Sequence, residues 1–163
     1  MIETFQATIR EAAARKQALR IRGGGSKEFY GGAPAGEPLE TTAYAGVLAY
    51  EPTELYFTAC CGTPLAEIEE VLARRGQMLA FEPPHFEAGA TLGGCIAAGL
   101  SGPRRASAGA VRDFVLGVKI IDGRGDLLRF GGQVMKNVAG YDVSRLMVGA
   151  LGTLGLIVEA SLK

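Results

Sequence analysis

Residues 19–27 read LRIRGGGSK, and this stretch indicates a strand that ends in a loop suited to an anion. Leu19 and Ile21 alternate with two arginines, which is the pattern of a half-buried β-strand. Three glycines follow at once, and because no side chain shields their amides, the loop can turn these N–H groups into a concave anion site. A flexible surface turn is the alternative that this motif alone leaves open.

Phosphate is the natural anion for such a loop. Each hydrogen bond to a charged acceptor contributes roughly 1.5–3 kcal/mol, whereas an ordered glycine costs roughly 0.5–1 kcal/mol relative to alanine. Three or four such bonds therefore outweigh the entropy that the glycines lose.

Two more glycine sets strengthen the prediction. Thr91 is predicted to cap a helix that begins at Gly93 and Gly94, and helix N-termini attract anions. Residues 149–155 carry glycine at every third position, just before the last predicted strand. Permissive segments from distant parts of the chain fit one long ligand, such as a dinucleotide. For the third set, close helix–strand packing is the alternative.

The composition narrows the possible partners. The chain has 163 residues with 17 basic and 17 acidic side chains, so its zero formal charge gives no reason to expect nucleic acid. It has no run of 18 apolar residues, and its charged N-terminus lacks the apolar centre of a signal peptide. We therefore expect a soluble cytoplasmic protein with one domain or two small lobes.

Several chemistries lack their motifs. No G-x-G-x-x-G opens a helix after a strand and no G-x-x-x-x-G-K-[ST] occurs, so the Rossmann and P-loop signatures fail. Cys60, Cys61 and Cys95 lack CxxC spacing, and we expect buried small side chains rather than a metal site. His85 is the only histidine and no G-x-S-x-G surrounds a serine, so no hydrolase machinery is visible.

The hydrophobic periodicities are those of an α+β fold. In the first half, a helix is predicted over 2–16, strands over 19–22, 47–50 and 55–60, and a second helix from its N-cap Thr63 to Gly76. Pro83 and Pro84 resist both helix and central strand, so the boundary between lobes is placed there. In the second half, a short helix within 90–100, a hairpin over 115–130 with its turn at 122–125, a helix over 142–147 and an alternating strand over 154–162 are predicted.

Four segments of the chain resemble, in order, the FAD-binding domain of the vanillyl-alcohol oxidase and p-cresol methylhydroxylase (PCMH-type) flavoprotein family. They read IRGGGS, ATLGGCIAAGLSGP, GAVRDFVLGVKIIDGRG and KNVAGYDVSRLMVGALGTLGLIVEASL, and they span nearly the whole chain. Each motif is weak by itself, but four in order make a specific match. Within the family, PPHF, GLSGPRR, VRDFVLG and VMKNVAGYD are similar to the FAD-binding E subunits of bacterial glycolate oxidase (glycolate dehydrogenase).

The resemblance implies two α+β lobes, residues 1–82 and 83–163, that form one FAD-binding domain. The second lobe would carry an antiparallel sheet, and FAD would extend between the lobes. Complete members continue into a cap or substrate domain, which we expect to be missing from these 163 residues.

The resemblance also implies the cofactor-binding positions. They are Gly23, Gly24, Gly25 and Ser26 as the pyrophosphate loop with Lys27 nearby; Thr91, Gly93 and Gly94 facing the pyrophosphate and ribityl chain; Ser101 and Gly102 beside the flavin; Arg112 and Asp113 at the turn that follows; and Gly155 and Ile157 at the adenine end.

Pro84 and His85 are possible neighbours of the flavin, although a structural role for a lone histidine is the alternative. Lys136 and Asn137 are further candidates beside the site or on a solvated face. Some family members attach FAD through a histidine in the glycine loop. Ser26 occupies that region here, so the expected FAD is noncovalent, and no catalytic residue is assigned.

By resemblance, the expected function is that of a flavin component in a 2-hydroxy-acid (glycolate) oxidase or dehydrogenase complex. A homologous flavin subunit and an iron–sulfur subunit would be its partners, and any membrane association would be indirect, through them. Two alternatives stay open: a scaffold subunit that binds flavin weakly or not at all, and a binding module for another nucleotide.

Overall fold

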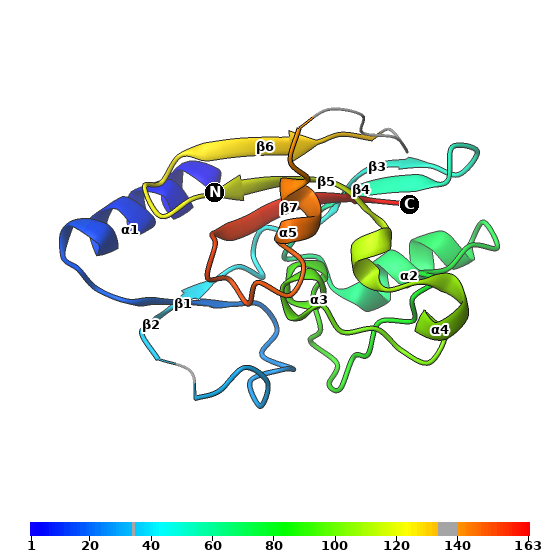
Figure 1. Cartoon of the computed structure of the whole chain (residues 1–163), viewed down its shortest axis with the longest axis horizontal. Helices are drawn as coiled ribbons and strands as arrows, with labels where there is room; N and C mark the ends of the chain where they lie inside the picture. Colours follow the sequence, from blue (N-terminus) through cyan, green and yellow to red (C-terminus); the bar gives the residue numbers. More distant parts are fainter. Residues whose placement is uncertain (34, 134–139) are drawn as a thin grey trace.

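The computed structural model describes residues 1–33, 35–133 and 140–163, so Lys136 and Asn137 lie outside the described residues. Groups of helices and groups of strands follow one another along the chain (Figure 1), and the strands form two sheets. The elements are α1 (Ile2–Ala14), β1 (Leu19–Arg22), β2 (Glu37–Glu40), β3 (Val47–Glu51), β4 (Tyr56–Cys60), α2 (Leu65–Ala73), α3 (Leu92–Ala98), α4 (Arg105–Ala108), the 3₁₀ helix η1 (Val111–Asp113), β5 (Val115–Ile121), β6 (Leu127–Gly131), α5 (Val143–Leu146) and β7 (Leu156–Leu162). This mixture of helices with an antiparallel sheet confirms the predicted α+β class.

The larger sheet has five strands in the order β3-β4-β7-β5-β6, and all its pairings are antiparallel. Strand β7 lies at the centre, between β4 and β5. Two strands therefore come from before the expected lobe boundary at 82–83 and three from after it. That boundary stays a prediction.

Strand β7 corrects the strict alternation predicted over 154–162. The strand begins at Leu156, and its pairing with β5 skips Val158, which is therefore the extra residue of a β-bulge. A bulge reverses which face the following side chains meet. Accordingly, Leu156 and Val158 pack in the cluster beside α1, whereas Ala160 and Leu162 pack in the larger core cluster. Both faces of this central strand are buried, because an apolar cluster covers each side of it.

The larger core lies between the five-stranded sheet and the helices α2 and α3, which lie together on the same side of the sheet in Figure 1. One face of α2 packs into this core, where Leu65, Ile68 and Leu72 are buried. The N-cap prediction for α2 is wrong. Thr63 is fully buried, its Oγ1 donates to the Cys60 carbonyl at 2.6 Å, and the helix begins only after Pro64.

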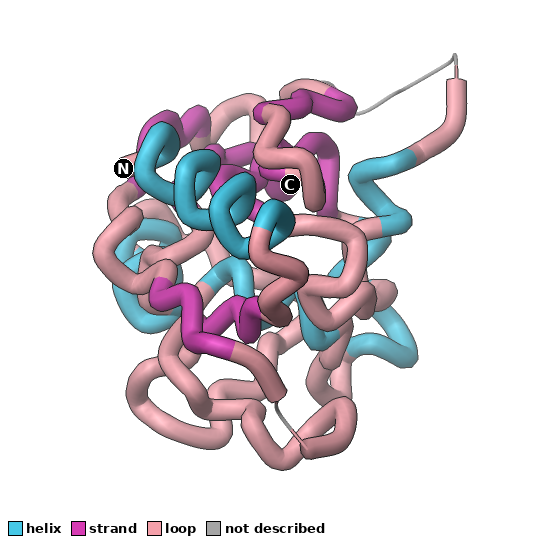
Figure 2. The backbone as a smooth tube through the Cα atoms, turned by 90° about the vertical axis from the view of Figure 1, so that its left-hand side faces the viewer, coloured by secondary structure: helices cyan, strands magenta, loops and turns pink. Residues whose placement is uncertain are grey.

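The smaller sheet pairs β1 with β2 in parallel. It joins α1 through a second apolar cluster, in which Phe5 and Ile9 of α1 meet Leu39 of β2. The tube in Figure 2 shows α1 running alongside these strands and the loop after β1 extending beyond them. This packing fixes the place where the triple-glycine loop begins. Among the described residues, no helix has both the length and the apolar composition needed to cross a membrane.

Candidate functional site

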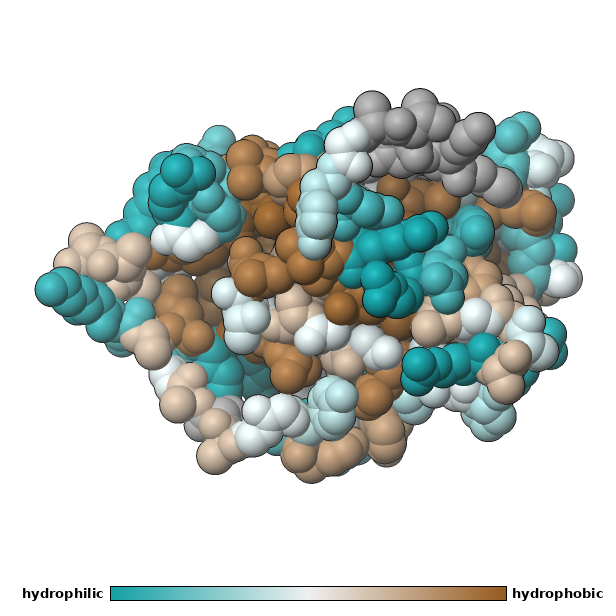
Figure 3. All heavy atoms as spheres, viewed as in Figure 1, coloured by the Kyte–Doolittle hydropathy of each residue, from teal (hydrophilic) through white to brown (hydrophobic). Residues whose placement is uncertain are grey.

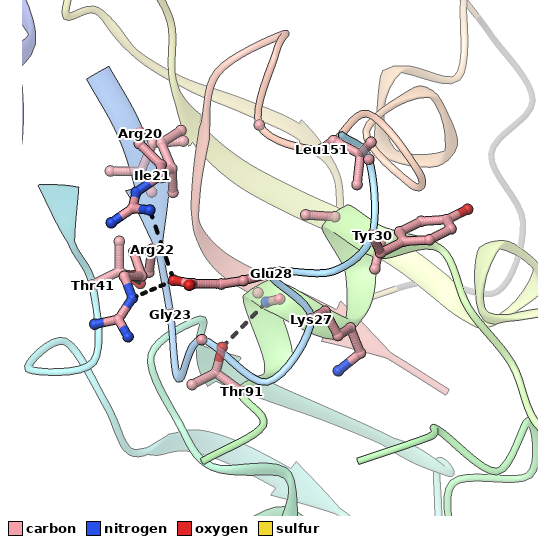
Figure 4. Close-up of a pocket in the computed structure, with 18 of the residues that line it drawn as sticks. Arg20, Ile21, Arg22, Gly23, Lys27, Glu28, Tyr30, Thr41, Thr91 and Leu151 are labelled. Carbon is pink, nitrogen blue, oxygen red and sulfur yellow. Dashed lines mark hydrogen bonds and ion pairs between the residues drawn. The ribbon is translucent and has the colours of Figure 1, made fainter. Parts of the chain in front are cut away.

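A partly open cavity of about 440 Å³ lies where the glycine segments meet (Figure 4). Its walls come from β1 with the following loop, from α3, and from the start of β7. The predicted cofactor positions that line it are Gly23, Gly24, Gly25, Ser26, Lys27, Thr91, Gly93, Gly94, Gly155 and Ile157. Residues from three distant parts of the chain are thus brought to one site.

The loop over residues 23–27 presents backbone amides at one wall of the cavity. None of its five N–H groups has a hydrogen-bond acceptor among the described residues. Its carbonyls are engaged locally, since Gly25 accepts from the Glu28 amide at 3.2 Å and Lys27 from the Tyr30 amide at 3.0 Å. Gly25 has a φ of +75°, which favours glycine. A row of unpaired amides at a cavity wall is an anion-binding arrangement.

The first two glycines are needed because two backbone segments press together. A Cβ on Gly24 would lie 1.5 Å from the carbonyl oxygen of Gly89, and one on Gly23 would lie 2.5 Å from Thr91 Oγ1. A side chain at either position would therefore separate the loop from residues 89–91. Gly89 thus packs against the glycine loop, a contact that no sequence motif predicted.

Two arginines and two carboxylates brace the same loop, and Figure 4 shows Arg20 and Arg22 pointing toward Glu28. Arg22 Nε donates to Glu28 Oε1 at 2.7 Å, and its NH1 donates to Glu40 Oε1 at 3.1 Å. The hydrogen bond with Glu28 raises the pKa of Arg22, and it lowers the pKa of Glu28. Arg20 NH1 lies 3.9 Å from the same Glu28 oxygen, while its buried Nε has no hydrogen-bond partner among the described residues.

Lys27 supplies a positive charge at the cavity. Its Nζ lies 3.4 Å from Ser26 Oγ, and no carboxylate of the described residues lies within salt-bridge distance. Burial lowers the pKa of Lys27, because the charged form is partly desolvated. An anionic ligand in the cavity would replace that lost solvation.

Helix α3 contributes a wall rather than free amides. Thr91 caps it as predicted, with Oγ1 accepting from the Gly94 amide at 3.2 Å. The Leu92 amide donates to Thr63 at 2.9 Å and the Gly93 amide to Cys61 at 2.8 Å. The first amides of α3 are thus used within the protein, contrary to the expectation that they face an anion. Thr91, Gly93 and Gly94 stay predicted as cofactor contacts through the surface that they present.

The segment before β7 completes the cavity. Gly155 has a φ of +141°, and a Cβ there would lie 2.7 Å from the carbonyl of Ile121. At Gly152, whose φ is +77°, a Cβ would lie 3.2 Å from Ile21 Cδ1. Gly152 thus lets the segment approach β1 closely, and Gly155 lets it approach the end of β5. This is close packing of a turn on strands, and not the helix–strand packing of the alternative. Together with Ile21 and Ile157 these glycines form an apolar end of the cavity.

Four other predicted positions lie outside the cavity lining, around α4 and η1. Ser101 Oγ accepts from the Val111 amide at 2.9 Å, and the Gly102 amide donates to Phe81 at 2.9 Å. Asp113 Oδ2 accepts from the Ala110 amide at 3.0 Å, and Arg112 is exposed. These contacts hold the chain between α3 and β5, and the flavin contacts of these residues stay predictions.

Pro84 and His85 also lie outside the lining of this cavity. His85 Nε2 is 3.1 Å from a carboxylate oxygen of Glu69 on α2, so the histidine is joined to a helix. Its nearness to the flavin stays a prediction.

The apolar end, the row of free amides and the unpaired ammonium fit the parts of a dinucleotide: an aromatic base and a diphosphate. Leu151, which is about half exposed, also lines the cavity. Figure 3 shows apolar side chains gathered near the middle of the face in view. Fold and site therefore define a nucleotide-cofactor domain of the α+β class. A family model described as "FAD binding domain" matches residues 2–131, and this chain belongs to that family. The predicted family and the FAD cofactor are confirmed.

Two curated relatives support the assignment to this family. The chain is 54% identical over 155 residues to "Glycolate oxidase subunit GlcE" of Escherichia coli, covering 95% of this chain and 44% of the relative. It is 34% identical over 167 residues to "D-2-hydroxyglutarate dehydrogenase" of Xanthomonas citri pv. viticola, covering 99% of this chain and 34% of that protein. The chain thus spans less than half the length of either relative. Among solved structures, alkyldihydroxyacetonephosphate synthase has the same fold, with a TM-score of 0.77 at 23% identity over 97% of this chain and 29% of that protein.

Proposed function

We propose that this chain is the FAD-binding part of a flavin-dependent 2-hydroxy-acid oxidase or dehydrogenase complex, with glycolate as the substrate. The observation that carries the proposal is the meeting of the free amides of residues 23–27 with α3 and the start of β7 in one cavity. The similarity to a glycolate oxidase subunit and to a 2-hydroxyglutarate dehydrogenase supports the substrate class.

Each wall of the cavity has a separate task in this proposal. The amides of residues 23–27 hold the diphosphate, and Lys27 neutralises part of its charge. Ile21 and Ile157 flank the adenine at the apolar end. When bound, FAD supplies acceptance of a hydride or of electrons, and the protein supplies binding and orientation.

Noncovalent attachment is part of the proposal. Ser26 stands in the glycine loop and has no side chain suited to a flavin linkage. His85 lies outside the cavity lining and pairs with Glu69 instead. Heat or acid treatment should therefore release unmodified FAD from the loaded protein.

The name of the Escherichia coli relative, "Glycolate oxidase subunit GlcE", supports a complex of several subunits. We propose a homologous flavin subunit and an iron–sulfur subunit as partners, to which this chain relays electrons, and a cytoplasmic location in which contact with a membrane runs through those partners. The residues that touch the 2-hydroxy acid belong to the wider complex in this proposal.

Two measurements test the proposal. Titration of the pure protein with FAD should give saturable binding and a perturbed flavin absorption band, with ADP as a weaker competitor. Reconstitution with the two partner subunits should give glycolate-dependent reduction of a dye. A folded protein that does not bind FAD would contradict the proposal and favour a scaffold subunit. Tighter binding of NAD than of FAD would favour a module for another nucleotide.

A further inference from the structure

A strained aromatic residue, Phe86, lies beside the ammonium of Lys27. Phe86 is 56% exposed and has a φ of +62°, in the left-handed region that favours glycine. Non-glycine residues held in that region are destabilising, and they concentrate at functional sites. Exposure and strain together indicate that this side chain is kept for a contact rather than for the core.

The contact is with the cation of the cavity. Lys27 Nζ lies 5.7 Å from the centroid of the Phe86 ring, within the range of a cation–π interaction. Phe29 also meets the ring, edge to face, with 5.0 Å between centroids. Phe86 belongs to the segment that leads to Gly89 and Thr91, so the ring and the loop of Lys27 come from opposite sides of the same junction.

We infer that Phe86 is a positioning residue for the cofactor, which holds the Lys27 ammonium at the cavity for the diphosphate of the ligand. The inference rests on the proposed function. A free lysine side chain has many rotamers, and fixing it on binding costs affinity. The Phe86 ring attracts the ammonium without neutralising it, because an aromatic face carries no net charge. A carboxylate in the same place would cancel the charge that the diphosphate needs.

The charge of the ligand separates this role from a merely structural one. Phe86→Leu removes the aromatic face and keeps an apolar side chain, whereas Phe86→Tyr keeps the face. We expect F86L to weaken binding of FAD and of ADP by about two- to five-fold, the range of an exposed cation–π contact, and to leave adenosine binding unchanged. F86Y should match the wild type. Calorimetric titration with FAD, ADP and adenosine gives the three affinities for each variant.

A double-mutant cycle then assigns the effect to Lys27. In a Lys27→Met background, F86L should cause no further loss of ADP affinity, because the partner of the ring is gone. Phe29→Leu is the matched control, since it removes the contact between the two aromatic rings and keeps the ring beside Lys27.

Four results would overturn the inference. F86L could leave FAD and ADP binding intact, it could weaken adenosine binding equally, its effect could persist in K27M, or F29L could reproduce it. A wild-type protein that is folded but binds neither FAD nor ADP would overturn the proposed function as well, so the two failures are distinguishable.

Discussion

Arg22 Nε donates to Glu28 Oε1 at 2.7 Å, and this contact joins the residue before the three glycines to the residue after Lys27. The loop that carries the free amides is therefore closed at its base by an ion pair. Because both side chains are partly exposed, the pair adds little to global stability. Its effect lies in ordering the loop.

Glu28→Ala should loosen residues 23–27 without unfolding the protein. We expect the backbone order parameters of Gly23, Gly24 and Gly25 to fall from the range of rigid backbone, about 0.85, toward about 0.6, with the melting temperature nearly unchanged. Glu40→Ala is the control, because it removes the other partner of Arg22 and leaves the loop closed. Equal loosening in both variants, or none in E28A, would contradict this role.

Gly24→Ala should destabilise the protein by about 1–3 kcal/mol, the usual cost of overpacking. The reason is the close approach to Gly89, which leaves no space for a Cβ. Gly123→Ala is a matched control, since a Cβ there meets nothing within 4 Å, and it should stay within about 0.5 kcal/mol of the wild type. Thermal unfolding measures both. A G24A protein of unchanged stability that fails to bind FAD would show that this glycine serves the ligand and not the packing of the loop.

The three cysteines should be unreactive in the native protein. Cys60, Cys61 and Cys95 are all buried, and burial raises the pKa of Cys95 to about 12 and that of Cys61 well above its ordinary value. The thiolate is the reactive form. At pH 8 we expect Ellman's reagent to detect no fast-reacting thiol before denaturation and three after it. A thiol that reacts within seconds in the folded protein would contradict the burial of these side chains.

FAD affinity should depend on pH through Lys27. Burial lowers the pKa of Lys27 below its ordinary 10.5 in the free protein, and a bound diphosphate favours the protonated form. Affinity should therefore stay constant while the ammonium is charged and fall as pH rises through the lowered pKa. Stability depends on pH with the opposite sign. Between the lowered pKa of the folded protein and the ordinary value of 10.5, Lys27 is protonated more fully in the unfolded chain than in the folded one. The contribution of Lys27 to the free energy of unfolding therefore rises with pH in that range. Lys27→Met should abolish the pH dependence of both FAD affinity and stability in this range. The same pH dependence in K27M as in the wild type would show that Lys27 is not its cause.

Local pattern was enough to predict most of the elements. The hairpin around Asp122 and the cap at Thr91 depend on residues close in sequence, and both are confirmed. The glycine segments were informative for a similar reason, since each marks a backbone that must adopt a positive φ or be approached closely. The three sets taken together predicted one long ligand such as a dinucleotide, and the resemblance then implied that this ligand is FAD.

Features that depend on register were not visible in the sequence. The bulge at Val158 follows from how β7 pairs with β5, and the buried hydroxyl of Thr63 follows from how β3 meets β4. Likewise, the amides of α3 are taken by carbonyls of Cys61 and Thr63, which only the folded chain brings near. Opposite charges at Arg22 and Glu28 were present in the sequence, but nothing local indicated that they pair.

The free amides of residues 23–27 are proposed to hold the diphosphate of FAD. Amide resonances of the ¹⁵N-labelled protein, followed during titration with FAD, test this proposal most directly. We expect the largest shifts at Gly23, Gly24, Gly25, Ser26 and Lys27, and much smaller shifts at Leu92 and Gly93, whose amides are already bonded. A folded protein in which FAD leaves the loop resonances unmoved, or shifts only residues far from this cavity, would contradict it.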